Sequence, residues 1–205
     1  MGEKPSASPD TKPKYKLEVL KMEVIPATLA TSKAKELSDK KILMVIAPKN
    51  FHYGEFAKPK AKFEAQGIKV TVASSTDKTA VGMYGKKVKP DINIKNAKAA
   101  DYDAVVFVGG TGSTVYKNDL NALSLVIEAK KNKKVIGAIC LAPVILAKAD
   151  IVDGKRTTVS SLGKHLMKKA GAICTGNKVE VDGLIVTGSG PDAAEEFAET
   201  IVKKL

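Results

Sequence analysis

The sequence contains very little arginine, and this scarcity argues against a nucleic-acid-binding protein. Of its 34 basic residues only Arg156 is an arginine, so the formal net charge of +12 comes from lysines spread along the chain. Arginine supplies the rigid fork that matches phosphates and guanine edges, and no nucleic-acid-binding motif accompanies the lysines. The charge therefore predicts a lysine-coated, soluble surface and no nucleic-acid partner.

The chain is also poor in cysteine and in long apolar runs. Cys140 and Cys174 are too few for a disulfide framework, and no Cys–His cluster predicts a metal site or other cofactor. The longest uncharged apolar stretch, residues 135–147, is too short to cross a bilayer and contains Pro143. The N-terminus lacks the apolar part of a signal peptide, although it also resembles the spacer left when a secretion or lipid-anchor signal is removed. We expect a cytoplasmic protein with no membrane partner.

The composition changes along the chain and predicts an N-terminal extension, residues 1–39, before one domain, residues 40–205. Residues 1–14 carry almost no apolar side chains and are predicted to be disordered. Residues 15–31 could cover part of the domain or a partner subunit, and their pattern does not decide between strand and helix. Residues 33–40 are predicted to be a linker. The apolar residues of the 15–31 segment are Leu17, Val19, Leu20, Met22, Val24, Ile25 and Leu29.

Strand-like and helix-like patterns alternate in the domain. Without tryptophan and with 5% aromatic residues, its core must be aliphatic. The alternation predicts an α/β fold with a doubly wound parallel sheet. Strands are expected at 42–47, 68–73, 103–108 and 135–139, with shorter strands within 79–94, 157–159 and 179–186. Helices are expected at 54–66, 118–132, 142–148, 162–170 and 191–205.

Cys140 follows one predicted strand and precedes a helix, at the strand end where sites form in open α/β sheets. Small residues surround it in Gly137-Ala138-Ile139-Cys140-Leu141-Ala142-Pro143, an arrangement typical of a nucleophile elbow. Such a turn would expose Sγ, the helix N-terminus would favour the thiolate, and the backbone N–H of Leu141 would face an oxyanion. The alternative is a buried packing cysteine.

Three further features are expected near the same edge of the sheet. Gly109-Gly110-Thr111-Gly112 ends a strand and lacks P-loop spacing, so we expect no nucleotide there. Glu55 could hold a proton or hydrogen-bond the thiol, although a glutamate in a first helical turn is more often a surface residue. His52 could face Cys140 as an accessory group or pack in a loop. His165 is expected to be exposed and Cys174 to be a packing residue.

Taken together, several segments resemble the ThiJ/PfpI family over about residues 40–205. They are 41–47, the surroundings of Glu55, 101–110, 138–143, and Gly188-Ser189-Gly190-Pro191 with Glu196-Phe197-Ala198. The resemblance implies a flavodoxin-like three-layer sandwich with a mainly parallel central sheet, assembled as a homodimer or higher homo-oligomer. It implies that Cys140 is reactive, that Glu55 hydrogen-bonds the thiol and lowers its pKa, and that Gly110 and Leu141 donate to an oxyanion.

The chain departs from the family at the accessory positions. Leu141 stands where peptidase-type members have histidine, Val159 where other members have one, and Ser189 where arginine is frequent. Because amide hydrolysis needs an acid for the leaving amine, an intracellular cysteine peptidase is the least favoured function. The favoured hypothesis is a glyoxalase or related hydrolase acting on a small carbonyl through Cys140 and Glu55. The alternative is a non-catalytic stress chaperone or redox sensor that uses Cys140 oxidation.

Overall fold

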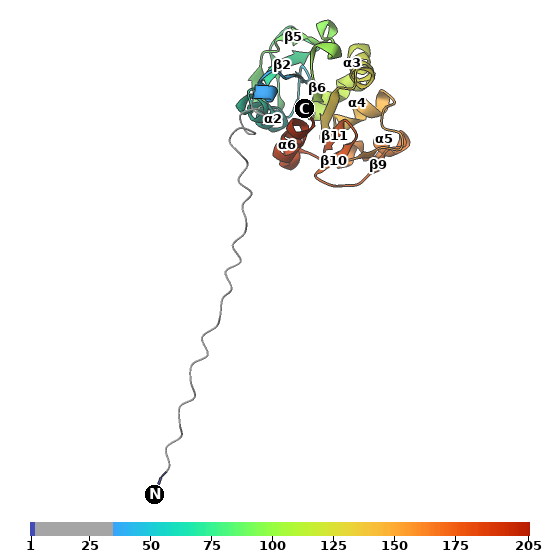
Figure 1. Cartoon of the computed structure of the whole chain (residues 1–205). Helices are drawn as coiled ribbons and strands as arrows, with labels where there is room; N and C mark the ends of the chain where they lie inside the picture. Colours follow the sequence, from blue (N-terminus) through green and yellow to red (C-terminus); the bar gives the residue numbers. More distant parts are fainter. Residues whose placement is uncertain (3–34) are drawn as a thin grey trace.

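The computed structural model describes residues 1–2 and 35–205, and residues 35–205 fold around one central sheet (Figure 1). Apart from residues 1–2, the predictions for residues 1–14 and 15–31 concern segments outside the described residues. The sheet has seven strands in the order β10-β11-β7-β6-β1-β2-β5. Its members are β1 (Lys41–Val45), β2 (Lys69–Ser74), β5 (Ile92–Asn93), β6 (Ala104–Phe107), β7 (Val135–Ile139), β10 (Val179–Asp182) and β11 (Ile185–Gly188).

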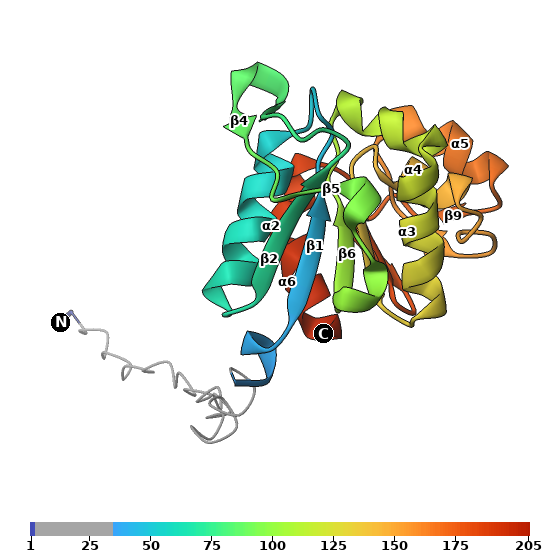
Figure 2. The ribbon, with the colours of Figure 1, turned by 90° about the horizontal axis from the view of Figure 1, so that it is seen from above.

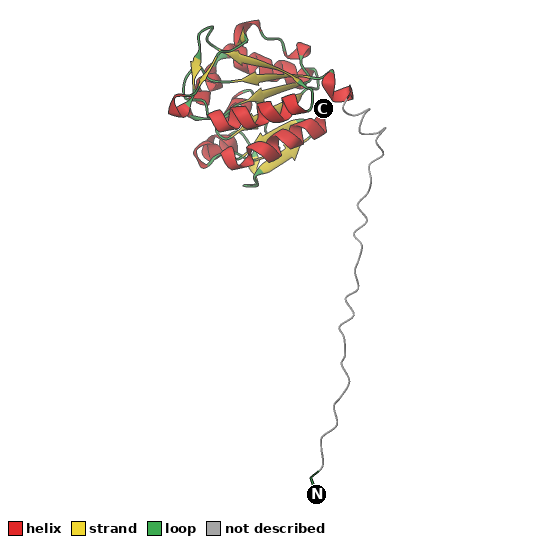
Figure 3. Ribbon diagram, turned by 90° about the vertical axis from the view of Figure 1, so that its left-hand side faces the viewer, coloured by secondary structure: helices red, strands yellow, loops and turns green. Residues whose placement is uncertain are grey.

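Helices cover both faces of this sheet, and they form the outer layers of a three-layer sandwich (Figure 2). Helices α2 (Tyr53–Ala65) and α6 (Ala194–Lys204) pack together on one face. Helices α3 (Leu120–Lys131) and α4 (Pro143–Lys148) pack together on the other, and α5 (Lys164–Lys169) packs on α4. Figure 3 shows two helices of one outer layer lying in front of the strands. The predicted flavodoxin-like α/β sandwich is therefore confirmed.

The sheet is mainly parallel, and its central strands are buried on both faces because the connecting helices cover both sides. Ile42, Leu43, Met44 and Val45 of β1 are all fully buried, which explains the continuous apolar run. Strand β1 pairs in parallel with β2 and β6, and β6 pairs in parallel with β7. Only the edge hairpin β10–β11 is antiparallel. The carboxyl ends of β1, β6 and β7 therefore lie side by side.

Shorter elements account for the remaining predicted strands. Residues 79–94 divide into an antiparallel pair, β3 (Ala80–Val81) with β4 (Lys87–Val88), and into β5, which joins the main sheet beside β2. The strand expected at 157–159 is β8 (Arg156–Thr157), which pairs in parallel with β9 (Ile173–Cys174). Strand β9 was not expected, because two residues carry no readable period.

The predicted linker at residues 33–40 is partly wrong. Residues 35–38 are helical, and the Leu37 side chain is only 5% exposed within the core. The Ser38 hydroxyl donates to the Lys35 carbonyl at 2.7 Å. One buried leucine among polar residues gives too weak a pattern for a helix, and its packing is decided by the tertiary fold.

Among the helices of the described residues, none combines the length and the apolar composition that a membrane span requires.

Candidate functional site

Cys140 lies on a strained turn between β7 and α4. Its φ of 63° is in the left-handed region, which a residue with a Cβ adopts at a cost. The backbone is fixed on both sides, because its N–H donates to the Gly188 carbonyl at 2.8 Å and its carbonyl accepts from the Ser160 N–H at 2.8 Å. The thiol is partly exposed and free. This geometry is that of the nucleophile elbow expected from the sequence.

Glu55 is fully buried in the first turn of α2, so it is not the surface residue that its position alone would favour. Burial raises the pKa of this carboxyl to about 7. The nearby Cys140 thiol and the Gly109 backbone N–H lower its pKa only in part. Neither carboxyl oxygen has a hydrogen-bond partner of normal geometry among the described residues. A carboxyl in this state exchanges a proton near neutral pH.

Gly109 allows the thiol and the carboxyl to approach each other. A Cβ at this position would lie 2.6 Å from the Cβ of Cys140 and would also collide with Glu55 Oε2. Any side chain on residue 109 would therefore separate the two groups. In the sequence, Gly109 is noticeable only as part of a weak Gly-rich motif. No local sequence pattern predicts that Cys140 and Glu55 approach each other at this glycine.

The two expected oxyanion donors lie beside the sulfur. The backbone N–H groups of Gly110 and Leu141 both act to lower the pKa of the Cys140 thiol, as hydrogen-bond donors to sulfur do. Gly110 has a φ of 94°, and a Cβ there would lie 2.5 Å from the backbone N of His52. Glycine is thus required for the loop after β6 to place this N–H.

The expectation of an acidified thiol is wrong in direction. Burial above all, and then the negative charge of Glu55, raise the pKa of Cys140, and the net value is about 11. The two N–H donors offset only part of this rise. Helix α4 starts three residues after Cys140 and has only 6 residues, so its dipole gives the sulfur little support. At neutral pH the proton therefore belongs to the thiol.

His52 contacts Glu55 and acts on it through the backbone. Its Nδ1 accepts from the Glu55 N–H at 3.3 Å, as the N-cap of α2, and lies 3.8 Å from Glu55 Oε1. Burial lowers the pKa of His52, so its neutral form, with Nδ1 unprotonated, is favoured. The proposed accessory residue is therefore a positioning group for Glu55 in this structure.

The two positions without histidine are filled by apolar side chains. Atoms of Leu141 and Val159 both lie within 3.3 Å of a Cβ built on Gly163, so these two residues are neighbours beside the elbow. Ser160, the next residue, has a buried hydroxyl without a partner among the described residues. His165 is exposed on α5, as expected. None of these groups can act as a base in place of the missing histidine.

Comparisons with known proteins agree with this geometry. The model of the DJ-1/PfpI family matches residues 40–204. An uncharacterized protein of Methanocaldococcus jannaschii, MJ0967, is 41% identical over 181 residues, which cover 87% of this chain and 88% of the relative. The crystal structure of a ThiJ/PfpI domain protein from Brachyspira murdochii is 32% identical with a TM-score of 0.77, over 80% of this chain and 94% of that one. Drosophila melanogaster DJ-1beta is 28% identical with a TM-score of 0.75, over 81% and 90%.

Proposed function

Since the chain belongs to the DJ-1/PfpI family, we propose that it converts small reactive carbonyl compounds, such as 2-oxoaldehydes, by covalent catalysis at Cys140. One observation carries the proposal: Cys140, a partly exposed residue on an elbow, lies beside a buried carboxyl with a pKa of about 7 and beside two backbone N–H groups. This set supplies a nucleophile, a base and an oxyanion site at one strand edge.

The raised thiol pKa supports Glu55 as the general base in this proposal. As Sγ attacks the aldehyde carbon, the S–C bond forms, the thiol proton moves to the Glu55 carboxylate, and the carbonyl π electrons move to oxygen. The N–H groups of Gly110 and Leu141 stabilise that oxyanion, which then takes the proton back from Glu55. The product of this step is a hemithioacetal. The overall conversion of a 2-oxoaldehyde and water to a 2-hydroxy acid is redox-neutral.

The surroundings favour a small aldehyde over a peptide. An aldehyde has no leaving amine, so its reaction survives the replacement of histidine by Leu141 and Val159. A peptide needs an acid to protonate the departing nitrogen, and the described residues place no charged histidine at the thiol. Peptidase activity is therefore the least supported alternative.

The pH dependence of catalysis tests the proposal. For wild-type protein, kcat/KM for methylglyoxal is expected to rise with pH below about 7 and to level off above it, because the base must be ionised. In Glu55→Gln the rise should move to higher pH, toward the pKa of the thiol itself, which without the Glu55 charge lies below about 11. Consumption of methylglyoxal and formation of the hydroxy acid are measured together. Absence of turnover at every pH would contradict the proposal.

A second candidate is the redox sensor. It is favoured by the buried Glu55 carboxyl without a partner of normal geometry, which when protonated could donate to an oxygen added to Cys140. The raised thiol pKa opposes it, because the thiolate is the form that peroxide oxidises. Intact mass after mild peroxide distinguishes the two: an oxygen adduct on Cys140 at neutral pH, in protein without carbonyl turnover, would favour the sensor.

We further propose that the protein is cytoplasmic and forms a homo-oligomer.

A further inference from the structure

The backbone N–H of Gly110 belongs to a short loop, and its direction depends on how that loop is held. Residue 110 lies between β6 and the short helix η4 (Thr111–Asn118). Its φ of 94° and ψ of 163° lie in a region that only glycine adopts readily. Glycine also restricts its own backbone least of all residues. A donor at this position therefore keeps one direction only if its neighbours hold the peptide planes on both sides.

The peptide plane that carries the Gly110 N–H is held by the loop before α2. The carbonyl of this plane belongs to Gly109, and it accepts from the His52 N–H at 3.0 Å. Two residues after Gly110, the Gly112 N–H donates to the Asn50 carbonyl at 3.0 Å. The start of η4 therefore lies directly against the loop before α2.

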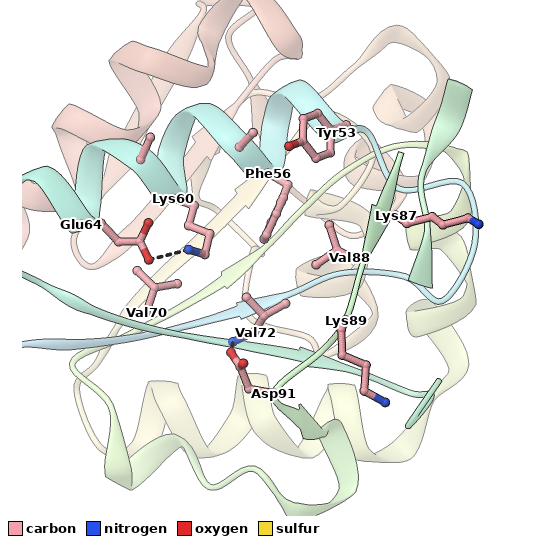
Figure 4. Close-up of a pocket in the computed structure, with 12 residues that line it drawn as sticks. Tyr53, Phe56, Lys60, Glu64, Val70, Val72, Lys87, Val88, Lys89 and Asp91 are labelled. Atoms are coloured by element: carbon pink, nitrogen blue, oxygen red, sulfur yellow. Dashed lines mark hydrogen bonds and ion pairs between the residues drawn. The ribbon is translucent and has the colours of Figure 1, made fainter. Parts of the chain in front are cut away.

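The loop before α2 is itself fixed by aromatic packing. Phe51 is fully buried, and its ring meets that of Phe56 edge to face, with the ring centroids 5.9 Å apart. Figure 4 shows Phe56 extending from α2 toward the sheet. The Met83 N–H also donates to the Phe51 carbonyl at 2.8 Å. The hydrogen-bond partners that this loop offers to the segment around Gly110 are therefore fixed in place.

The peptide plane after Gly110 is held by a side chain. Ser113 is fully buried in η4, and its hydroxyl donates to the Gly110 carbonyl at 2.8 Å. The Ser113 N–H donates to the same carbonyl at 3.1 Å, which is the ordinary bond of such a turn, so the hydroxyl adds a second and shorter one. Burial of a hydroxyl has a desolvation cost that alanine would avoid. Packing alone therefore does not account for a serine at this position.

We propose that Ser113 is a positioning residue that fixes the Gly110 N–H in the direction of the Cys140 sulfur. Its hydroxyl restrains the plane after Gly110, while the His52 N–H restrains the plane before it. A donor that is already aligned stabilises a developing oxyanion more than one that must first reorient. The inference rests on the proposed function for its effect on turnover, but not for its effect on the thiol.

Thr114 makes the same kind of bond one residue later and provides the matched control. Its hydroxyl donates to the Thr111 carbonyl at 2.9 Å, near the surface and away from Gly110. Ser113→Ala and Thr114→Val each remove one hydroxyl, and the hydrogen bond that it donates, from η4. Only the first of these variants loses a bond to the residue that carries the donor.

The test is the rate at which iodoacetamide alkylates Cys140 in each variant, followed by peptide mapping between pH 7 and pH 10. The Gly110 N–H lowers the pKa of this thiol, so a misdirected donor should raise the pKa and leave less thiolate. We expect Ser113→Ala to slow alkylation of Cys140 several-fold and Thr114→Val to match wild type. General loosening of the fold would have the opposite sign, because it would speed alkylation of both Cys140 and Cys174.

The alanine variant is expected to fold. The Ser113 N–H still donates to the Gly110 carbonyl in that variant, so no buried acceptor is left without a partner. An unchanged alkylation rate of Cys174, read from the same peptide maps, verifies the fold.

Kinetics give a second readout. Because the oxyanion forms only after the substrate has bound, Ser113→Ala should lower kcat for methylglyoxal by about 10-fold and leave KM nearly unchanged. Thr114→Val should leave both constants at their wild-type values.

Two results would overturn the proposal. The first is alkylation of Cys140 at the wild-type rate or faster in folded Ser113→Ala, since the N–H would then keep its direction without the hydroxyl. The second is an equal slowing in Thr114→Val, which would show that η4 as a whole directs the donor. Absence of turnover in wild-type protein would remove the proposed function and leave the alkylation test unaffected.

Discussion

Cys140 and Cys174 are both free and both partly exposed, yet the fold gives them different surroundings. Cys174 lies in the short strand β9, where its thiol donates to the Ala172 carbonyl at 4.0 Å. It lines a cavity of about 200 Å³ with Lys164 and Val159. Cys140 lies on a turn with a φ of 63°, next to a buried carboxyl and two backbone N–H groups.

The comparison shows that two thiols of similar exposure can have different surroundings. What separates Cys140 is a set of neighbours that can take its proton and stabilise an oxyanion. Three strands contribute to this set, because Glu55 follows β1, Gly110 follows β6 and Leu141 follows β7. Cys174 has no glutamate or second cysteine lining its cavity. The following predictions test this difference.

The largest effect is expected from removing each sulfur in turn. Cys140→Ser should reduce methylglyoxal consumption by about 10³-fold or more, since a nucleophile and its base act as a unit. Cys174→Ser should retain near-wild-type activity and provides the matched control. Steady-state kinetics on both variants measure the contrast. Equal activity of the two variants would remove the distinction between the thiols.

Glu55 should also make stability depend on pH. Its pKa is raised in the folded state, from an ordinary 4.5 to about 7, so its stabilising contribution is complete below pH 4.5 and is lost as pH rises through 7. At about 1.4 kcal/mol per pH unit the loss approaches about 3 kcal/mol. Urea unfolding at pH 5 and pH 8 should show Glu55→Gln losing less stability than wild type. Glu196→Gln, on the exposed face of α6, should follow wild type.

Gly109→Ala should force the two reactive groups apart. The new methyl group would lie 2.6 Å from both the Cys140 Cβ and the Ile139 carbonyl oxygen, so the surrounding backbone must move. We expect a loss of about 1–3 kcal/mol in the free energy of unfolding and a loss of turnover. Gly190→Ala is the control, because nothing lies within 4 Å of its added Cβ. Equal stability of the two variants would mean that residue 109 tolerates a side chain.

The smallest expected effect concerns whether Glu55 raises or lowers the pKa of the Cys140 thiol. If its negative charge raises the pKa of Cys140, Glu55→Gln should lower that pKa below about 11 and speed iodoacetamide alkylation of Cys140 several-fold at pH 8. Cys174, followed in the same peptide maps, should be unchanged. Slower alkylation of Cys140 would support the opposite role, a carboxyl that acidifies the thiol.

Much of the site was predictable because its residues follow recognisable strands. The apolar runs of β1, β6 and β7 placed Glu55, Gly110 and Cys140 at one edge, since parallel strands end together. The contacts of Cys140 with Ser160 and Gly188 were not predictable. Ser160 lies twenty residues from Cys140 with no motif of its own, and such a contact appears only when the chain has folded.

The sequence alone determined the main strands and helices of the sandwich and the elbow at Cys140, because hydrophobic periods and small residues around a turn are local properties. Only the tertiary structure decided the pKa directions of Glu55 and Cys140. Desolvation depends on everything packed around a group, and here Gly109 allows a buried carboxyl and a partly buried thiol to come together. A local pattern cannot report how much water the assembled fold removes.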